Sequence, residues 1–436
     1  MLRDFKLKID NFGPINHADL HTSKINIIAG KNASGKTTIS KLLYCIITAF
    51  STDGDYLSYE SMKEQFNLLI NNLQIPYTES DKITQLEEIR FNIESDKEFK
   101  IENLLANYDK FESFIDTLEL DDEEFFKNAI AKNKENIKRT QRIGNYWPLL
   151  LNLIKNEFSG DEQIFENYSE SELTIYNDNG NNPFDYFIRI DEKGIRVLPG
   201  TAYENTITTN REAIYIETPY FLDYKIPFSQ FNYYGQKQYH QWLLYQKLAD
   251  QSSKSDILDD INNGDIIKFK QDVDELINGQ FNFNNRGLLE FKQNGKTFDL
   301  NNTSSGIKSI GMLQLLLENR KLKENTYLIM DEPEVHLHPE WQVKLAEILV
   351  LLVKDLDVKL FINSHSPQFI EAIEVYSTKY GLKDETNFYL SQKDENTKKY
   401  NVKQIPHDNL YEIYNNLGDP YDIIDDVRGE NMANHL

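Results

Sequence analysis

Apolar and charged residues alternate at the start of the chain. Phe5, Leu7 and Ile9 are each followed by a charged residue, which is the period-two pattern of a strand with one buried face. Residues 25–29 form a short apolar run typical of a buried strand, and the longer apolar segment at residues 39–50 predicts a helix. The chain therefore begins with the strand–loop–helix order of an α/β fold.

Two later apolar runs end in polar residues that could carry chemistry. Residues 327–330 lead to Asp331 and Glu332, and residues 359–363 lead to Ser364 and His365. In open α/β sheets, ligands bind at the carboxyl ends of the strands. We therefore expect these polar side chains to meet the loop that follows the first buried strand.

The chain between these segments is much longer than a compact α/β core requires. No heptad pattern persists there, and proline and glycine residues interrupt the apolar runs, which favours a compact, mainly helical insertion over a coiled coil. We predict a core formed by residues 1–50 and 200–436, interrupted by a helical insertion at residues 51–199 with short strands at its end.

Three regions of this central part predict strands rather than helices. Residues 173–198 show short alternating runs, and residues 213–216 predict a further strand that returns to the core sheet. Residues 288–300 predict a hairpin that turns at Asn294-Gly295, a pair typical of tight β-turns.

Composition narrows the class of protein. The 436 residues are 40% hydrophobic and 27% charged, which is typical of a folded chain in water. The longest apolar stretch, Leu42–Phe50, is too short to span a bilayer, so we expect no membrane association. The single cysteine, Cys45, suits a reducing cytoplasm. The net charge of −23 argues against a protein that coats nucleic acid unaided, but leaves room for a local basic groove.

The loop between the first buried strand and the helix matches the phosphate-binding pattern of nucleotide-binding proteins. Its glycines let backbone N–H groups surround a phosphate, and the following helix adds its positive end. Lys36 can reach the outer phosphates, and the Thr37 hydroxyl can bind Mg²⁺. The predicted cofactor-binding residues here are Gly30, Asn32, Ser34, Gly35, Lys36, Thr37 and Thr38.

The second acidic motif complements this loop. Asp331 is expected to hold the metal together with Thr37, and Glu332 is expected to orient and deprotonate the attacking water. His365 is then placed where it can contact the terminal phosphate, so Glu332 and His365 are the predicted catalytic residues.

With these motifs placed, the chain resembles the ABC-type ATPases of the RecF/Rad50/SMC class. Within it, the chain looks most like the OLD-like ATPases that are encoded beside nucleases in bacterial anti-phage systems. Residues 302–309 stand where the signature of that class is expected, residues 334–339 resemble its D-loop, and His365 resembles its switch histidine. The signature departs from the usual pattern, because only Ser305 and Gly306 match it cleanly.

The resemblance implies an α/β fold with an ABC-type P-loop ATPase core and a mixed sheet, and ATP and Mg²⁺ as cofactors. It also implies a homodimer or higher homo-oligomer that sandwiches ATP, in which Ser305 and Gly306 act on the partner's nucleotide. The implied function is a slow or regulated ATPase switch that controls a separate effector, a nuclease in anti-phage defence. Only seventy-one residues follow His365, too few for the nuclease domain of OLD-type relatives, so we expect that activity on another chain.

Two other functions fit the sequence. One is a RecF-like repair ATPase that binds DNA directly, for which the basic segment at residues 127–142 is the candidate contact. The other is a scaffold with a structural ATP site. The eleven aromatic residues between Tyr215 and Tyr245 suit either a protein-binding surface or core packing.

Overall fold

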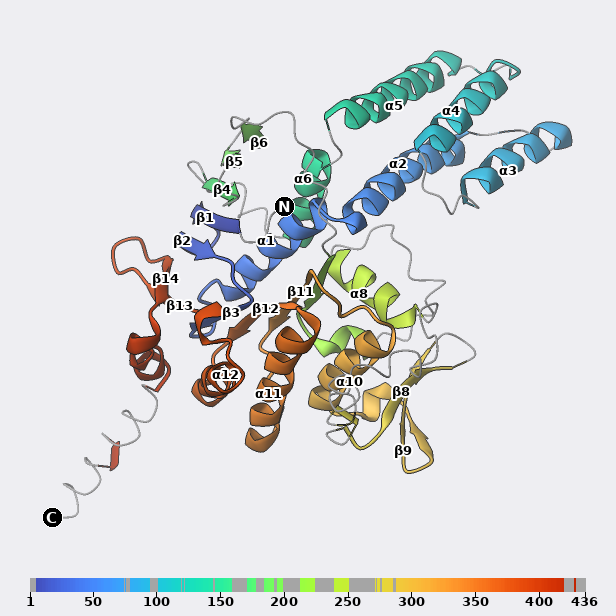
Figure 1. Cartoon of the computed structure of the whole chain (residues 1–436). Helices are drawn as coiled ribbons and strands as arrows, with labels where there is room; N and C mark the ends of the chain where they lie inside the picture. Colours follow the sequence, from blue (N-terminus) through green and yellow to red (C-terminus); the bar gives the residue numbers. More distant parts are fainter. Residues whose placement is uncertain are drawn as a thin grey trace. The chain divides into compact units, whose positions relative to one another are not determined.

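In the computed structural model, the chain forms two compact units, whose elements are labelled in Figure 1. The larger unit comprises residues 1–47 and 153–436, and the smaller comprises residues 48–152. The structure describes residues 5–73, 75, 79–94, 101–118, 120, 122–143, 146–158, 171–177, 184–191, 194–198, 212–223, 239–250, 271, 273–274, 277–284, 288–418 and 427–428.

A mixed sheet runs through the larger unit. Among the described residues it has eleven strands, in the order β6-β5-β4-β1-β2-β14-β13-β3-β12-β11-β7. The strands, in chain order, are β1 (Phe5–Phe12), β2 (Ile15–His21), β3 (Ile25–Gly30), β4 (Ser171–Asn177), β5 (Phe184–Asp191), β6 (Gly194–Leu198), β7 (Glu212–Ile216), β11 (Thr326–Asp331), β12 (Lys359–Ser364), β13 (Thr386–Lys393) and β14 (Tyr400–Ile405). The predicted mixed-sheet α/β fold is confirmed.

The strands next to β3 form the parallel part of the sheet. β12 and β13 flank β3, β11 pairs with β12, and β7 pairs with β11, all in parallel. Every residue of β3 is buried, which is the pattern expected of a strand covered on both faces. The carboxyl ends of β3, β11 and β12 therefore lie at one edge of the sheet.

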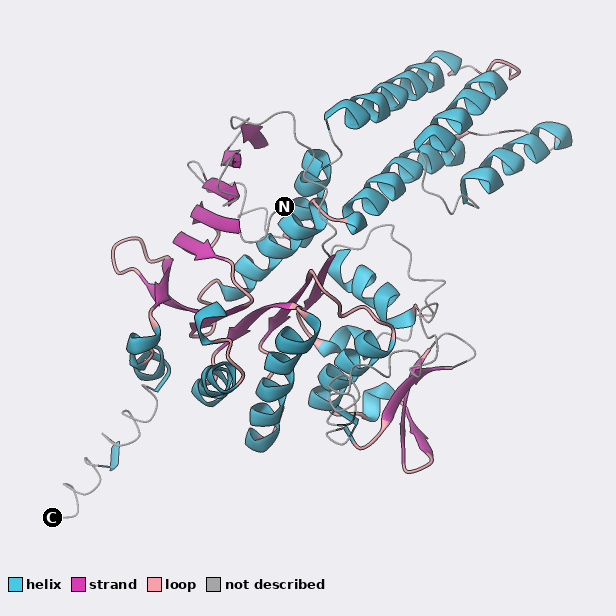
Figure 2. Ribbon diagram, viewed as in Figure 1, coloured by secondary structure: helices cyan, strands magenta, loops and turns pink. Residues whose placement is uncertain are grey.

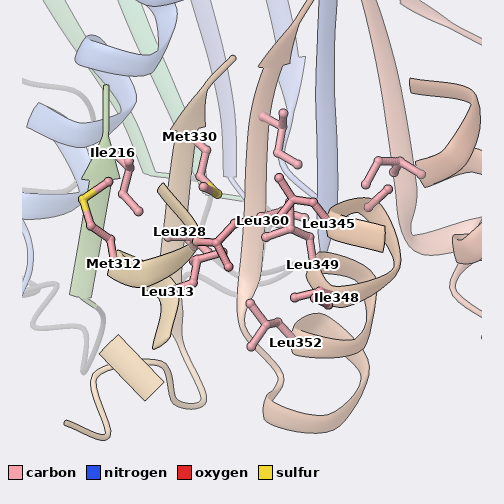
Figure 3. Packing of buried hydrophobic residues seen from close by; sticks show 14 of the residues in the cluster. Ile216, Met312, Leu313, Leu328, Met330, Leu345, Ile348, Leu349, Leu352 and Leu360 are labelled. Atoms are coloured by element: carbon pink, nitrogen blue, oxygen red, sulfur yellow. The ribbon is translucent and has the colours of Figure 1, made fainter. Parts of the chain in front are cut away.

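Helices cover both faces of this parallel region. α10 (Ser305–Glu318), α11 (Pro339–Leu356) and α12 (Pro367–Lys379) pack on one face, where apolar residues of β11 and β12 meet the helix side chains labelled in Figure 3. α1 (Lys36–Ala49) lies on the other face, where Ser40 accepts a hydrogen bond from Asn363 of β12. The phosphate loop therefore leads directly into a helix that is anchored on the sheet.

The strands at the end of the predicted insertion belong to the main sheet. β4 pairs with β1 in antiparallel register, and β5 and β6 continue outward from β4. The chain divides at residues 152/153 rather than at the predicted 199/200. Alternation of apolar and polar residues predicts a strand but not which strand it pairs with. Here β4 pairs with β1, which joins β4–β6 to the main sheet.

The smaller unit is helical among its described residues (Figure 2). Its helices are α2 (Thr52–Asn72), α3 (Ser80–Glu94), α4 (Ile101–Ile115), α5 (Glu123–Ile143) and the start of α6 (Tyr146–Glu157). Phe66 of α2 meets Tyr108 and Phe111 of α4 edge-on, with ring centroids 4.3 and 5.4 Å apart. These fully buried rings supply the core that makes the unit compact.

Two lysines of the basic segment at residues 127–142 form ion pairs within this unit. Lys127 lies 2.6 Å from both Asp116 and Glu123. Lys134 lies 2.5 Å from Asp109 and 2.7 Å from Glu112. Part of the positive charge of this segment is therefore paired with acids of the same unit.

The hairpin before α10 fits its prediction. β9 (Leu289–Gln293) and β10 (Lys296–Phe298) turn at Asn294 and Gly295, which both have positive φ, and β8 (Gln280–Phe283) completes a small second sheet. The helix that follows, α10, begins at Ser305, because Ser304 caps it by accepting a hydrogen bond from the Ile307 N–H.

The aromatic stretch is used for packing where the structure describes it. Tyr215, Phe221, Trp242 and Tyr245 are buried, whereas Tyr220 is exposed. The aromatic residues at positions 224–238 lie outside the described residues. In the part of the chain that is described, no helix is long and apolar enough to cross a membrane.

Candidate nucleotide site

The phosphate loop makes a tight turn between β3 and α1. Ala33 and Gly35 both have positive φ, at 60° and 85°. A Cβ on Gly35 would lie 2.3 Å from Cδ1 of Ile15, so both the backbone angle and the available space favour glycine there. Asn32 and Thr37 are exposed, whereas Ser34 is buried. The loop thus presents part of its surface to a ligand while its base is packed against the sheet.

Lys36 reaches back along the loop. Its Nζ donates to the carbonyl oxygens of Gly30 and Lys31, at 2.9 and 3.0 Å, and lies 3.6 Å from Oε1 of Glu332. Burial lowers the pKa of Lys36, and the nearby carboxylates oppose that change. An anionic phosphate would supply this partly buried cation with a stronger partner than the two carbonyl groups do.

Ser391 supports the loop from behind. It lies in β13 directly opposite Gly30, and its hydroxyl donates to the backbone carbonyl of Ser34 at 2.8 Å. No motif marks this serine, which is 357 residues from its partner, so sequence reasoning missed it.

We expect Ser391→Ala to weaken nucleotide binding by about fivefold, because a single lost hydrogen bond is worth about 1 kcal/mol. Titration with a fluorescent ATP analogue checks this. Ser377→Ala is the matched control, since Ser377 is also a buried serine bonded to a backbone carbonyl, that of Glu374. Equal affinities for the two variants would contradict a supporting role for Ser391.

Asp331 ends β11 among neutral donors. Its Oδ1 accepts from the side-chain amide of Asn363 at 2.5 Å, and its Oδ2 accepts from the Tyr215 hydroxyl at 2.9 Å. The hydroxyls of Thr37 and Ser40 also interact with this carboxyl, and burial raises its pKa. The predicted pair of Thr37 and Asp331 is therefore brought together.

Glu332 adopts an unusual backbone conformation beside the loop. Its φ is 47°, which is uncommon for a residue with a long side chain, and its N–H donates to the carbonyl of Asn363 at 2.9 Å. Its Oε1 lies 3.0 Å from Nδ1 of His365. This pair lowers the pKa of Glu332 and raises the pKa of His365. Lys36, Glu332 and His365 thus converge, as the sequence predicted.

Glu334 links the segments that follow β11 and β12. The hydroxyl of Ser364 donates to Oε1 of this buried glutamate at 2.5 Å. Burial raises the pKa of Glu334. Sequence reasoning placed Glu334 in the D-loop without a role, and its partner could have been found only from the strand register.

The signature residues Ser305 and Gly306 lie at the start of α10, close to the segment that follows β11. A Cβ on Gly306 would be 2.5 Å from Leu337 and 3.0 Å from the carbonyl of His336, so the first turn of α10 packs closely on the segment after β11. Ser305 is partly exposed beside it. His336 also has the Tyr220 hydroxyl 3.0 Å from its Nε2.

The donor set at Asp331 fits a magnesium ion. The carboxylate is flanked by neutral partners and by the Thr37 hydroxyl, and Mg²⁺ prefers oxygen ligands of this kind beside phosphates. The half-buried carboxylate would gain from a nearby cation. Asp331 and Thr37 could therefore hold the metal, while Lys36 could hold phosphate.

Comparison with known proteins shows which family the chain resembles. A family model described as AAA ATPase domain matches residues 5–370. No curated protein matches the chain.

Solved structures that resemble the chain include three SMC heads. The SmcHead bound to the C-winged helix domain of ScpA has 12% identity and a TM-score of 0.42, and the alignment covers 92% of this chain and 97% of that one. The SMC head domain from Thermotoga maritima has 10% identity, a TM-score of 0.38, and coverage of 93% and 99%. The Smc head domain from Pyrococcus furiosus, with an extended coiled coil and bound to the C-terminal domain of ScpA, has 11% identity, a TM-score of 0.42, and coverage of 97% and 98%. Likenesses this low carry no functional conclusion.

Proposed function

Because this chain belongs to the AAA ATPase domain family and is an ATPase, we propose that it works as an ATP–Mg²⁺-dependent switch. In this proposal two copies close around ATP, and closure or hydrolysis controls a separate effector protein in the cytoplasm. The observation that carries it is the convergence of Lys36, Glu332 and His365, from three separate elements, beside the phosphate loop.

Each residue of this cluster has a role in binding. Lys36 exchanges its carbonyl contacts for the outer phosphates, and the N–H groups around Gly35 hold the oxygens between them. Thr37 and Asp331 hold Mg²⁺, which when bound neutralises charge on the phosphates. Asn32 and Thr38 complete the loop on either side of these groups.

Hydrolysis follows from the same geometry. The oxygen of a water attacks the terminal phosphorus, its proton passes to Glu332, and the bond to ADP breaks. The contact between Glu332 and His365 keeps the imidazole at the phosphate end, where it can donate to the terminal phosphate. Lys36 and His365 both contact Oε1 of Glu332, so a phosphate that attracts these two groups would free the carboxylate to accept a proton.

Closure requires a second copy. Ser305 and Gly306 begin α10, and the N–H groups of a helix start attract phosphate. The contacts of Gly306 are with His336 and Leu337 rather than with the phosphate loop, which supports their action on the nucleotide of a partner.

We expect the chain to double its mass in saturating Mg-ATP when hydrolysis is blocked by Glu332→Gln. Light scattering checks this, with ADP and the Lys36→Ala variant as controls that stay monomeric. A Glu332→Gln protein that remains monomeric in Mg-ATP would contradict the two-copy site.

The effector is proposed to be a nuclease in anti-phage defence. Its support is the resemblance of the ordered motifs to OLD-like ATPases. Purification with the product of the neighbouring reading frame tests this. Copurification and a change in ATP hydrolysis are expected, whereas fast hydrolysis that no partner alters would contradict a switch.

A further inference from the structure

β11 carries the metal-binding acid between two parallel strands. In the register of the sheet, Asp331 lies opposite Asn363 of β12, and Tyr215 of β7 lies opposite Ile329 of β11. Since side chains alternate between faces, Tyr215, Asp331 and Asn363 project on the face that α1 covers. The strand order therefore brings one donor to each side of the acid.

Each oxygen of the Asp331 carboxylate accepts a hydrogen bond from a different donor. The Tyr215 hydroxyl donates to Oδ2 and the Asn363 amide donates to Oδ1. Tyr215 is 1% exposed and Asn363 is fully buried.

Both donors are themselves held in place. The Asn363 amide also donates to Ser40 of α1 at 2.7 Å. The ring of Tyr215 packs against His240 and Tyr44, with centroids 4.7 and 5.9 Å away. The acid is thus oriented by groups with little freedom of their own.

The orientation of the Asn363 side chain leaves one of its polar atoms without a hydrogen bond in the described part of the chain. Its carbonyl oxygen Oδ1 is buried and has no hydrogen-bond partner among the described residues. A buried acceptor without a partner is unfavourable, and an apolar residue would avoid it. The amide is better explained by its bond to Asp331 than by packing alone.

We propose that Tyr215 and Asn363 are positioning residues that fix the Asp331 carboxylate for Mg²⁺. Both donors are neutral, so they set the plane of the carboxylate without neutralising it. A lysine or arginine there would orient the acid but compete with the metal. The inference rests on the proposed function, because it assumes that Asp331 binds the metal that accompanies ATP.

Tyr215→Phe tests the proposal, because it removes the hydroxyl and keeps the ring. Binding of a fluorescent ATP analogue is titrated with Mg²⁺ and repeated in EDTA. Loss of a partner that orients a metal ligand typically weakens metal binding by 10–100-fold. We expect the Mg²⁺ concentration for half-maximal enhancement of binding to rise by about tenfold, with affinity in EDTA unchanged.

Tyr389→Phe is the matched control. Tyr389 is also a buried tyrosine, and its hydroxyl donates to the backbone carbonyl of His21 at 2.7 Å. It should leave the Mg²⁺ titration unchanged. Asn363→Leu, of similar size, provides an independent second variant should Tyr215→Phe fold poorly in thermal unfolding.

Three results would decide against the proposal. Mg²⁺ titrations that match the unaltered protein in both variants would overturn it. An equal loss of affinity with and without Mg²⁺ would show general damage to the phosphate loop and overturn it too. If the unaltered protein binds the analogue without any response to Mg²⁺, the proposed metal-dependent function fails, and this inference fails with it.

Discussion

Replacing Glu332 with glutamine is expected to lower kcat for ATP hydrolysis by about a thousandfold, within the range for loss of a general base. Glutamine keeps the size of the side chain but cannot accept the proton of the attacking water. Glu332 is the base in our proposal because of its position: its Oε1 lies 3.0 Å from Nδ1 of His365 and 3.6 Å from Nζ of Lys36.

ATP affinity should change little in this variant, because Lys36 and the phosphate loop are retained. Steady-state hydrolysis and analogue binding measured together separate the two effects. Glu340→Gln is the matched control, since Glu340 is an exposed glutamate on α11 that pairs with Lys344. Hydrolysis that persists at the original rate would show that Glu332 is not the base.

Replacing Glu157 with glutamine is expected to lower the free energy of unfolding of the larger unit by about 3 kcal/mol, because breaking this buried ion pair leaves His240 with only the more distant Glu217 as its counter-charge. Glu157 is buried at the end of α6, and its Oε2 lies 2.7 Å from Nδ1 of the buried His240. Nε2 of His240 lies 3.2 Å from Glu217, which Lys41 of α1 approaches at 2.8 Å.

The pH dependence of stability follows from the same network. The two glutamates outweigh burial and raise the pKa of His240 to about 9, from 6.5. The stability that this protonated histidine supplies is present below pH 6.5 and is lost as the pH rises through about 9. His240 and Lys41 lower the pKa of Glu217 to about 2, so its contribution is present above pH 4.5 and is lost as the pH falls through about 2.

Urea unfolding followed by tryptophan fluorescence measures these effects, since Trp242 is buried in α8 (Tyr239–Ala249), the helix that carries His240. In Glu157→Gln, the alkaline loss of stability should move to lower pH. Glu412→Gln, which removes a surface pair with Lys403, is the control and should cost less than about 1 kcal/mol. Identical unfolding curves for Glu157→Gln and the unaltered chain would contradict the network.

The elements that touch the phosphate loop could be predicted well. β1, β3, β11 and β12 coincide with their predicted ranges to within a few residues, because strong alternation or a continuous apolar run marks each of them. The start of α1 was less well predicted. α1 begins at Lys36, before the predicted apolar run at residues 39–50, because polar residues fill its first turn.

The supporting residues of the site could not be predicted. Ser391, Tyr215 and Asn363 carry no motif, and each acts through a partner that is distant in sequence. The strands β4–β6 were predicted as strands, but not as part of the main sheet. In every case the missing information was the pairing of distant segments.

The sequence by itself determined the phosphate loop, the acidic pair and the histidine, because each follows a buried strand with a strong local pattern. It also favoured compact helices over a long coiled coil for the first part of the insertion, since no heptad repeat persists there. The tertiary structure alone decided which strands flank β11, and so which neutral groups orient Asp331. Local patterns depend on residues a few positions apart, whereas strand order depends on how distant strands bury their faces together.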